Sequence, residues 1–198
     1  MNLKVKNALI SVSNKENLTS LLKTLKKFNI NIISSGGTYA YIKKLGYQCT
    51  ELSKYTGFKE MLDGRVKTLH PKIHAGILHD RQNKKHKSEM YKQNFPPIDL
   101  IVVNFYPFQK IVTNTRNPKQ IIENIDIGGP TMVRAAAKNF KNVSIVTSRD
   151  DYKSLIKELE SLKGKTSLKF RELMSSKAFG LTAYYDAMIA NWFNKKLK

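Results

Sequence analysis

The feature that most constrains the fold is an apolar run at residues 98–105, with the sequence IDLIVVNF. A run of this length without polar alternation is typical of a strand buried on both faces, as the inner strands of a parallel sheet are. Pro107 cannot donate to a strand ladder, so this strand has to end before it. A sheet that contains such a strand needs helices on both of its faces.

Strands and helices alternate before this run. Residues 7–12 (NALISV) predict a strand, and Ser13 and Asn14 after it are candidates for the cap of a helix with apolar residues at helical spacing. Residues 30–33 predict a second strand, which leads through the turn SSGGT at residues 34–38 into another helix. The alternation predicts an α/β fold, with a mostly parallel sheet flanked by helices on both faces in three layers.

The remainder of the chain continues the pattern. It predicts a third strand at residues 47–52, an exposed helix or mobile excursion at residues 80–93, a helix up to Lys138 behind a second Gly-rich start, a strand at residues 143–147, a helix at residues 152–162 and a helical tract at about residues 168–195. Within this tract, Phe179, Tyr184, Met188 and Trp192 are expected to pack in the core or in an interface.

The composition bounds the class of protein. A chain of 198 residues with 41% hydrophobic residues fits one domain, so we expect residues 1–198 to form a single domain. No apolar run approaches the roughly 20 residues of a membrane span, and the first residues lack the features of a signal peptide. The single cysteine, Cys49, fits a reducing compartment. We therefore expect a cytoplasmic protein without a membrane partner.

The net charge of +20 would ordinarily suggest nucleic acid as a partner. However, the basic residues are scattered along the chain and are mostly lysines, whereas proteins that read sequence favour arginine. The charge is therefore a weak argument for a nucleic-acid partner, and we expect none. The same positive charge would also favour a small anionic ligand.

The turn at residues 34–38 is a candidate site for an anion. Gly36 and Gly37 leave backbone N–H groups open at a helix N-terminus, where the helix dipole favours negative charge, and Ser35 and Thr38 add hydroxyl groups. If the first two strands are neighbours in a parallel sheet, Ser13 and Lys15 would lie beside this turn and complete a phosphate pocket. The alternatives are an ordinary strand-to-helix turn and an ordinary surface lysine.

Further polar side chains stand at the expected ends of elements. Residues 63–71 (DGRVKTLHP) crowd Arg65, Lys67 and Thr68 into a turn, for which a solvated basic loop is the alternative. Tyr106 follows the buried strand at the edge of the sheet where α/β proteins bind ligands.

Asp126 and Lys138 bracket one helix, where both charges are also explained as favourable partners of the helix dipole. The histidines at positions 70, 74 and 79 have neither cysteine partners nor the spacing of a zinc motif, so we expect no metal.

Several of these segments together resemble a known family, the inosine monophosphate (IMP) cyclohydrolase domain of the bifunctional purine-biosynthesis protein. The matching segments are SVSNK at 11–15, SSGGT at 34–38, YTGF at 55–58, DGRVKTLHPKIHAGIL at 63–78, VNFYPF at 103–108, IDIGGPTMVRAAAKN at 125–139 and TAYYDAMIANWF at 182–193. The resemblance implies a methylglyoxal-synthase-like fold. It also implies the last step of purine synthesis, in which a formamido-imidazole-carboxamide ribonucleotide closes to IMP with loss of water, without cofactor or metal.

The resemblance also implies residue roles. It assigns the 5′-phosphate to Ser13, Lys15, Ser35, Gly36, Gly37 and Thr38, and the surroundings of the base to Arg65, Lys67, Thr68, Asn104, Tyr106, Asp126 and Lys138. Within that set we expect Lys138 and Tyr106 to stabilise the oxyanion and Asp126 to accept a proton. Arg65 and the backbone N–H groups of Ile127, Gly128 and Gly129 would hold the carboxamide oxygen. Lys67 would serve either the phosphate or the ring.

Alternative functions remain within the same fold. A methylglyoxal-synthase-like lyase would use the same Gly-rich turn but would not be expected to carry HPKIHAGIL or NFYPF, and a nucleotide-sensing domain would bind without turnover. Family members usually continue into a larger transformylase domain, which these residues do not contain. The chain is therefore expected to be a stand-alone cyclohydrolase, a protein paired with a separate transformylase, or an isolated domain. The resemblance is compatible with a homodimer.

Overall fold

A five-stranded parallel sheet forms the centre of the computed structural model, which describes residues 2–196. The strand order is β4-β3-β2-β5-β6, and every neighbouring pair is parallel. The strands are β2 (Asn7–Val12), β3 (Asn31–Ser34), β4 (Thr50–Glu51), β5 (Leu100–Asn104) and β6 (Ser144–Val146). The predicted α/β fold with a mostly parallel sheet is confirmed.

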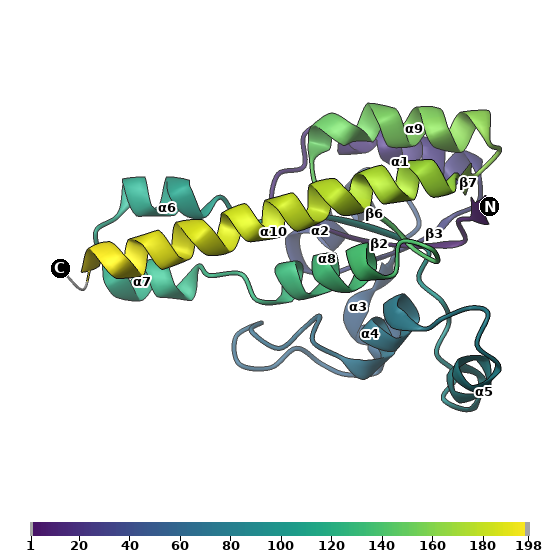
Figure 1. Ribbon diagram of the computed structural model, residues 1–198, viewed down its shortest axis with the longest axis horizontal. Helices are drawn as coiled ribbons and strands as arrows, with labels where there is room; N and C mark the ends of the chain where they lie inside the picture. Colours follow the sequence, from purple (N-terminus) through teal and green to yellow (C-terminus); the bar gives the residue numbers. More distant parts are fainter. Residues whose placement is uncertain (1, 197–198) are drawn as a thin grey trace.

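Helices cover both faces of the sheet. Figure 1 shows α1 (Leu18–Lys27) and α9 (Tyr152–Ser161) on one face, with α4 (Pro71–Leu78) and α8 (Gly128–Lys138) on the other. Consequently every residue of β5 except Asn104 is buried, as its unbroken apolar sequence requires. The core is built mainly from the aliphatic residues of these strands and of the helix faces turned toward them.

The long helix α10 (Leu168–Lys196) runs past the sheet and is anchored at its beginning. Arg171 is 1% exposed, and its guanidinium donates to the backbone carbonyls of Phe140 (2.7 Å) and Thr166 (2.5 Å). Thr166 belongs to β7 (Lys165–Thr166), which pairs antiparallel with β1 (Leu3–Lys4). One buried side chain therefore joins the start of α10 to the loop that follows α8 and to this small ribbon.

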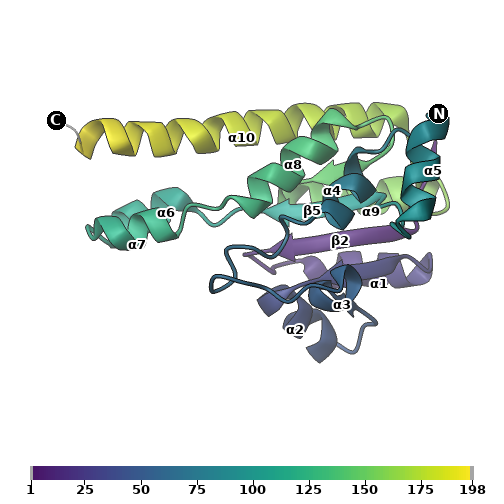
Figure 2. The same ribbon diagram turned by 90° about the horizontal axis from the view of Figure 1, so that it is seen from below.

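The C-terminal half of α10 packs on a second, smaller apolar cluster beyond the sheet. Figure 2 shows α6 (Phe108–Asn114) and α7 (Pro118–Glu123) under this half of the helix, away from the strands. Phe108, Ile121 and Tyr185 are its buried residues, and Trp192 packs against them. Tyr184, which was expected to pack, is 60% exposed, and the neighbouring Tyr185 is the buried residue.

Some local predictions are wrong. Ser13 and Asn14 do not cap α1, because the helix begins only at Leu18, with Asn17 as its N-cap in the left-handed conformation. The third strand is reduced to β4, since the chain turns at once into α3 (Leu52–Thr56).

The short helices α4, α6 and α7 were not predicted. Two of them begin at a proline, Pro71 and Pro118, which is favourable in a first helical turn. The remaining elements are α2 (Gly36–Lys44), α5 (Lys84–Lys92), which has no buried residue, and the 3-10 turn η1 (Arg149–Asp151). Within residues 2–196 no helix combines the length and the apolar character that a membrane crossing requires.

Replacing Arg171 by Met is expected to lower the free energy of unfolding by about 2–4 kcal/mol, because it leaves the buried Thr166 carbonyl and the partly buried Phe140 carbonyl without this donor. Urea denaturation measures the change. Lys169→Met, at an exposed position two residues earlier, is the control and should change stability by no more than about 0.5 kcal/mol. Equal stability of the two variants would show that Arg171 does not anchor α10.

Candidate active site

The site lies at the carboxyl edge of the sheet, where β2 and β5 end side by side. The chain passes from β2 to β3 and β4 on one side and returns to β5 on the other, so the direction of strand order reverses between β2 and β5. Open α/β sheets bind their ligands in the crevice at such a reversal. Ser13 follows β2 and Tyr106 follows β5, so both come from this point of the sheet.

Asn104, the last residue of β5, holds the loop after β2 in place. Its side-chain oxygen accepts hydrogen bonds from the Ser13 N–H (2.7 Å), the Ser13 hydroxyl (2.8 Å) and the Asn14 N–H (3.1 Å). Its amide group donates to the Asn14 carbonyl at 3.1 Å. The residue predicted to contact the base therefore shapes the loop that carries Ser13 and Lys15.

Two lysines converge on the Gly-rich start of α2. Lys67 Nζ lies 3.0 Å from the position that a Cβ on Gly36 would take, and Lys15 Nζ lies 3.9 Å from the corresponding position on Gly37. The first N–H groups of a helix have no acceptor within the helix, and Ser35 at the N-cap makes no side-chain capping bond. Backbone donors, the helix dipole and two ammonium groups therefore meet at one place, which suits a phosphate.

The Thr38 hydroxyl is engaged within the protein. It accepts a hydrogen bond from the Val12 N–H (3.1 Å) and donates to the Val12 carbonyl (3.0 Å), so it joins α2 to the end of β2. Thr38 is 5% exposed. Its backbone N–H, like those of the two glycines, belongs to the first turn of α2, and this is the group that it can offer to an anion.

The loop between α3 and α4 connects this turn with the start of α8. Lys67 lies at Gly36. The next residue, Thr68, is 8% exposed and lies so close to Gly128 that a Cβ on Gly128 would collide with the Thr68 hydroxyl. Because Lys67 and Thr68 are consecutive, the N-terminal ends of α2 and α8 face the same short segment. The sequence predicted the loop residues but not that they join the two Gly-rich helix starts.

Asp126 lies two residues before the first residue of α8, and its side chain folds back over the first turn of the helix. Its Oδ1 accepts a hydrogen bond from the Gly129 N–H at 2.9 Å, and its own N–H donates to the hydroxyl of Tyr185 at 2.8 Å. Burial raises the pKa of the Asp126 carboxyl above its ordinary value, and the bond from Gly129 opposes this in part. A carboxyl group with a raised pKa takes up a proton more readily than an ordinary one, which suits it to proton transfer with a ligand.

Acidic partners already neutralise two of the predicted cations. Lys67 pairs with Glu60 at 2.9 Å, and Arg65 pairs with Glu123 at the end of α7. Arg65 is therefore brought to the segment that leads into Asp126, with a mostly exposed side chain, and not to the phosphate turn. Neither Glu60 nor Glu123 was predicted, since nothing in the local sequence distinguishes them from surface glutamates.

Lys138 is not brought together with Asp126 within one chain. Lys138 is the last residue of α8 and is exposed, whereas Asp126 lies before the first residue of this helix. Eleven helical residues separate the ends of α8 by about 15 Å. The two residues bracket the helix in sequence, as expected, but the geometry of a single chain does not support a shared site.

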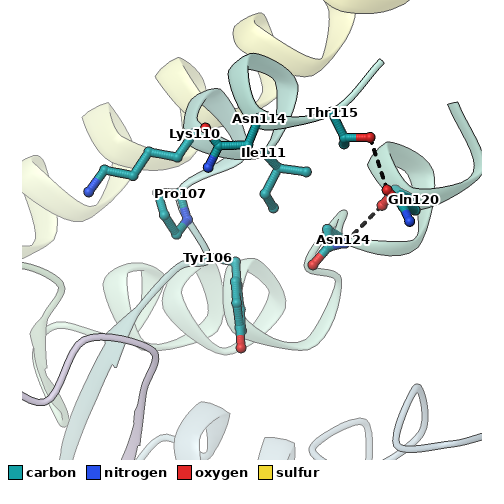
Figure 3. A pocket seen from close by; sticks show the side chains of 8 residues that line it. All are labelled: Tyr106, Pro107, Lys110, Ile111, Asn114, Thr115, Gln120 and Asn124. Carbon is teal, nitrogen blue, oxygen red and sulfur yellow. Dashed lines mark hydrogen bonds between the residues drawn. The ribbon is translucent and has the colours of Figure 1, made fainter. Parts of the chain in front are cut away.

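Tyr106 borders an open cavity of 660 Å³ beyond the end of β5. Figure 3 shows Tyr106 and Asn124 on two sides of this cavity, with Ile111 pointing into it. Gln120 joins its wall by a hydrogen bond from Thr115 (2.9 Å). Tyr106 is 57% exposed, so its hydroxyl is accessible to a ligand. Among residues 2–196, no three His, Cys, Asp or Glu side chains gather as a metal site would require.

Comparison with known proteins identifies the class. Residues 17–131 match the model of the MGS-like domain family, and residues 136–198 match that of the AICARFT/IMPCHase bienzyme family. The chain belongs to the MGS-like domain family, as the fold and the position of the site at the sheet edge lead one to expect.

Individual relatives narrow the class. The chain is 48% identical over 195 residues to the bifunctional purine biosynthesis protein PurH of Bradyrhizobium diazoefficiens, covering 98% of this chain and 37% of that protein. It is 50% identical over 188 residues to PurH of Clostridium kluyveri, covering 95% of this chain and 38% of that protein. The chain thus spans little more than a third of these curated relatives.

A solved structure is similar over its whole length. The crystal structure of ForH superimposes with a TM-score of 0.85 at 31% identity and covers 96% of this chain and 97% of the ForH chain. The resemblance to the cyclohydrolase part of the purine-biosynthesis protein, inferred from the motifs, is confirmed at the level of the family.

Replacing Gly128 by Ala is expected to destabilise the protein, although alanine is ordinarily better than glycine in a helix by up to about 1 kcal/mol. The new methyl group would collide with the Thr68 hydroxyl. Removing that hydroxyl in the double variant G128A/T68A should recover most of the loss. Gly180→Ala, in α10 with no atom within 4 Å of the added Cβ, is the control and should be stabilising. Thermal unfolding distinguishes the three; a G128A protein as stable as G180A would contradict the close approach.

Proposed function

We propose that the chain is an IMP cyclohydrolase. It would close 5-formamidoimidazole-4-carboxamide ribonucleotide to IMP by forming a carbon–nitrogen bond and releasing water, which is the reverse of a hydrolase reaction. The observation that carries the proposal is the segment of Lys67 and Thr68. Lys67 lies at the phosphate turn, and Thr68 lies against the start of α8, where the partly buried Asp126 carboxyl accepts a hydrogen bond from Gly129. The family relationship to PurH supports the same reaction.

The 5′-phosphate would bind at the start of α2. Lys15 and Lys67 would approach it from two sides, and the N–H groups of Gly36, Gly37 and Thr38 would complete its coordination. Ser35 and Ser13 would contribute hydroxyl groups at the rim, although the Ser13 hydroxyl already lies 2.8 Å from Asn104. Holding the phosphate end of the substrate helps to keep its carboxamide and formyl groups in the geometry that ring closure needs.

The reaction needs a proton acceptor and a stabilised oxyanion. The carboxamide nitrogen attacks the formyl carbon of the same molecule, the formyl oxygen takes up negative charge, and the nitrogen loses a proton. Asp126 would accept that proton, and the Tyr106 hydroxyl would donate to the oxyanion. Transfer of a proton to the oxyanion gives a hydroxyl group. This group then leaves as water, taking up a second proton, while the former formamido nitrogen loses its proton and the C=N bond of the ring forms.

The carboxamide oxygen would be held at the start of α8. The N–H groups of Ile127 and Gly128 are open to it, while the Gly129 N–H is already bonded to Asp126. Arg65 would join them if it left Glu123. A catalytic role of Lys138 stays a prediction of the sequence, since its position at the far end of α8 does not support it.

Other attributes of the protein belong to the same proposal. We infer one domain over the whole chain, a purine ribonucleotide as its partner, and association into a homodimer. The PurH relatives are named as bifunctional, so a transformylase activity is expected on a further domain or a separate protein. A methylglyoxal-synthase-like lyase and a nucleotide sensor are the competing functions in the same fold.

The experiment that tests the proposal is to incubate the purified chain with the formamido ribonucleotide and follow IMP formation in the ultraviolet. Asp126→Asn should lower kcat by about 10²–10⁴-fold with little change in KM, because the amide cannot accept the proton. Folded protein that forms no IMP would contradict the main proposal. Turnover by D126N close to that of the unsubstituted protein would remove only the role of Asp126.

The same substitution has an opposite effect on stability. A carboxyl group whose pKa is raised in the folded state stabilises the fold when it is protonated, and this contribution is lost as the pH rises through that pKa. D126N should therefore be at least as stable as the unsubstituted protein at pH 7, with the difference disappearing below the ordinary carboxyl pKa of about 4. Thermal unfolding as a function of pH measures this. A large loss of stability at pH 7 would indicate that Asp126 is mainly a structural cap.

Lys67→Met is expected to weaken the binding of IMP roughly 10-fold to 100-fold, since one charged donor to the phosphate is lost. Isothermal titration measures the dissociation constant. Lys59→Met on the same loop removes an equal charge from an exposed residue and is the matched control. If the two variants bind IMP equally, Lys67 does not contact the phosphate and only the general charge of the loop matters.

A further inference from the structure

Tyr185 of α10 is a buried polar group that the chemistry above does not use. It is 2% exposed, and its hydroxyl accepts the 2.8 Å hydrogen bond from the backbone N–H of Asp126. It is the hydroxyl-bearing residue among the three buried members of the second apolar cluster. A cluster of this kind gains nothing from a phenol over a phenylalanine unless the hydroxyl has a partner.

The ring of Tyr185 contacts the other segment of the site as well. It lies 5.0 Å from the ring of Phe105, the residue before Tyr106, and 6.2 Å edge-on from Phe108. One side chain therefore packs against the segment that carries Tyr106 and holds the backbone of Asp126. The two segments are separated by α6 and α7 in sequence, and α6 and α7 lie outside the main core.

The hydrogen bond acts at a point where small rotations matter. The Asp126 carboxyl is already held on its other side by the Gly129 N–H at 2.9 Å, and there is no room for a Cβ on Gly129 beside it. The Asp126 N–H, which donates to the Tyr185 hydroxyl, fixes the peptide plane between Ile125 and Asp126. Rotation of this plane would turn both the carboxyl and the open N–H groups of Ile127 and Gly128.

We propose that Tyr185 is a positioning residue for the reaction, which joins the Tyr106 and Asp126 segments and sets the orientation of the Asp126 carboxyl. The inference rests on the proposed function for its effect on turnover, but not for the hydrogen bond itself. Tyr185 does not touch the substrate. It acts through Asp126, so the C-terminal helix is part of the machinery and not only a cover for the sheet.

Tyr185→Phe tests the proposal, because it keeps the ring in the cluster and removes only the hydroxyl. The expected result is a fall in kcat of roughly tenfold, with KM for the formamido ribonucleotide nearly unchanged. Tyr184→Phe, at the neighbouring position that is 60% exposed, is the matched control and should leave both constants unchanged. A role in packing alone would leave kcat of Y185F equal to that of Y184F, which would overturn the proposal.

A second measurement separates this inference from the proposed function. Hydrogen exchange of the Asp126 amide, followed by NMR, should be faster by roughly tenfold or more in Y185F, with amides of β5 unchanged. If the unsubstituted chain forms no IMP, the proposed reaction fails, and the exchange rate still decides whether Tyr185 holds Asp126. Unchanged exchange at Asp126 in a folded Y185F protein would overturn the positioning role whatever the activity.

Discussion

The amide of Asn104 is the point on which the arrangement of the site depends. In a parallel sheet the strands themselves do not dictate how the loops leave their carboxyl ends. Here one side chain at the end of β5 satisfies three donors and one acceptor of the loop after β2, so the two segments beside the reversal of strand order are fixed to each other. Lys15 emerges from that loop, and Tyr106 follows Asn104 by two residues. These hydrogen bonds therefore fix the loop that carries Lys15 to the end of the strand that leads to Tyr106.

The rest of the site is built from two starts of helices that face one loop. Backbone N–H groups cost no side-chain entropy and are already oriented when a ligand arrives, so a site made of them is preorganised. Glycine is required at Gly128 because Thr68 occupies the space of a side chain, and at Gly36 by its φ of 52° as well as by the approach of Lys67. The glycines that the backbone geometry requires are therefore the same residues whose N–H groups are available to a ligand.

The sequence predicted well those features that follow from local patterns. The buried apolar run predicted β5, and the Gly-rich turns predicted the starts of α2 and α8. The expected parallel pairing of the first two strands correctly predicted that Lys15 lies beside the turn at Gly37. It did less well where contacts between distant segments decide the outcome. Ser13 and Asn14 form hydrogen bonds with Asn104 and do not cap a helix. Arg65 pairs with Glu123, 58 residues away in sequence. Tyr185 rather than Tyr184 is buried, because the packing of α10 on α6 and α7 sets the rotation of the helix, and the sequence of the helix alone does not.

The acidic partners of Lys67 and Arg65 have a consequence for how a ligand enters. A phosphate that binds at Lys67 has to take the place of Glu60, and a carboxamide that reaches Arg65 competes with Glu123. Binding is then an exchange of anions, in which the protein gives up one ion pair for another, so the net gain is smaller than the number of cations suggests. Each carboxylate is at hand to recapture its cation when the product dissociates. Such a site favours release of a bound anion over its retention, as the proposed formation of IMP would require.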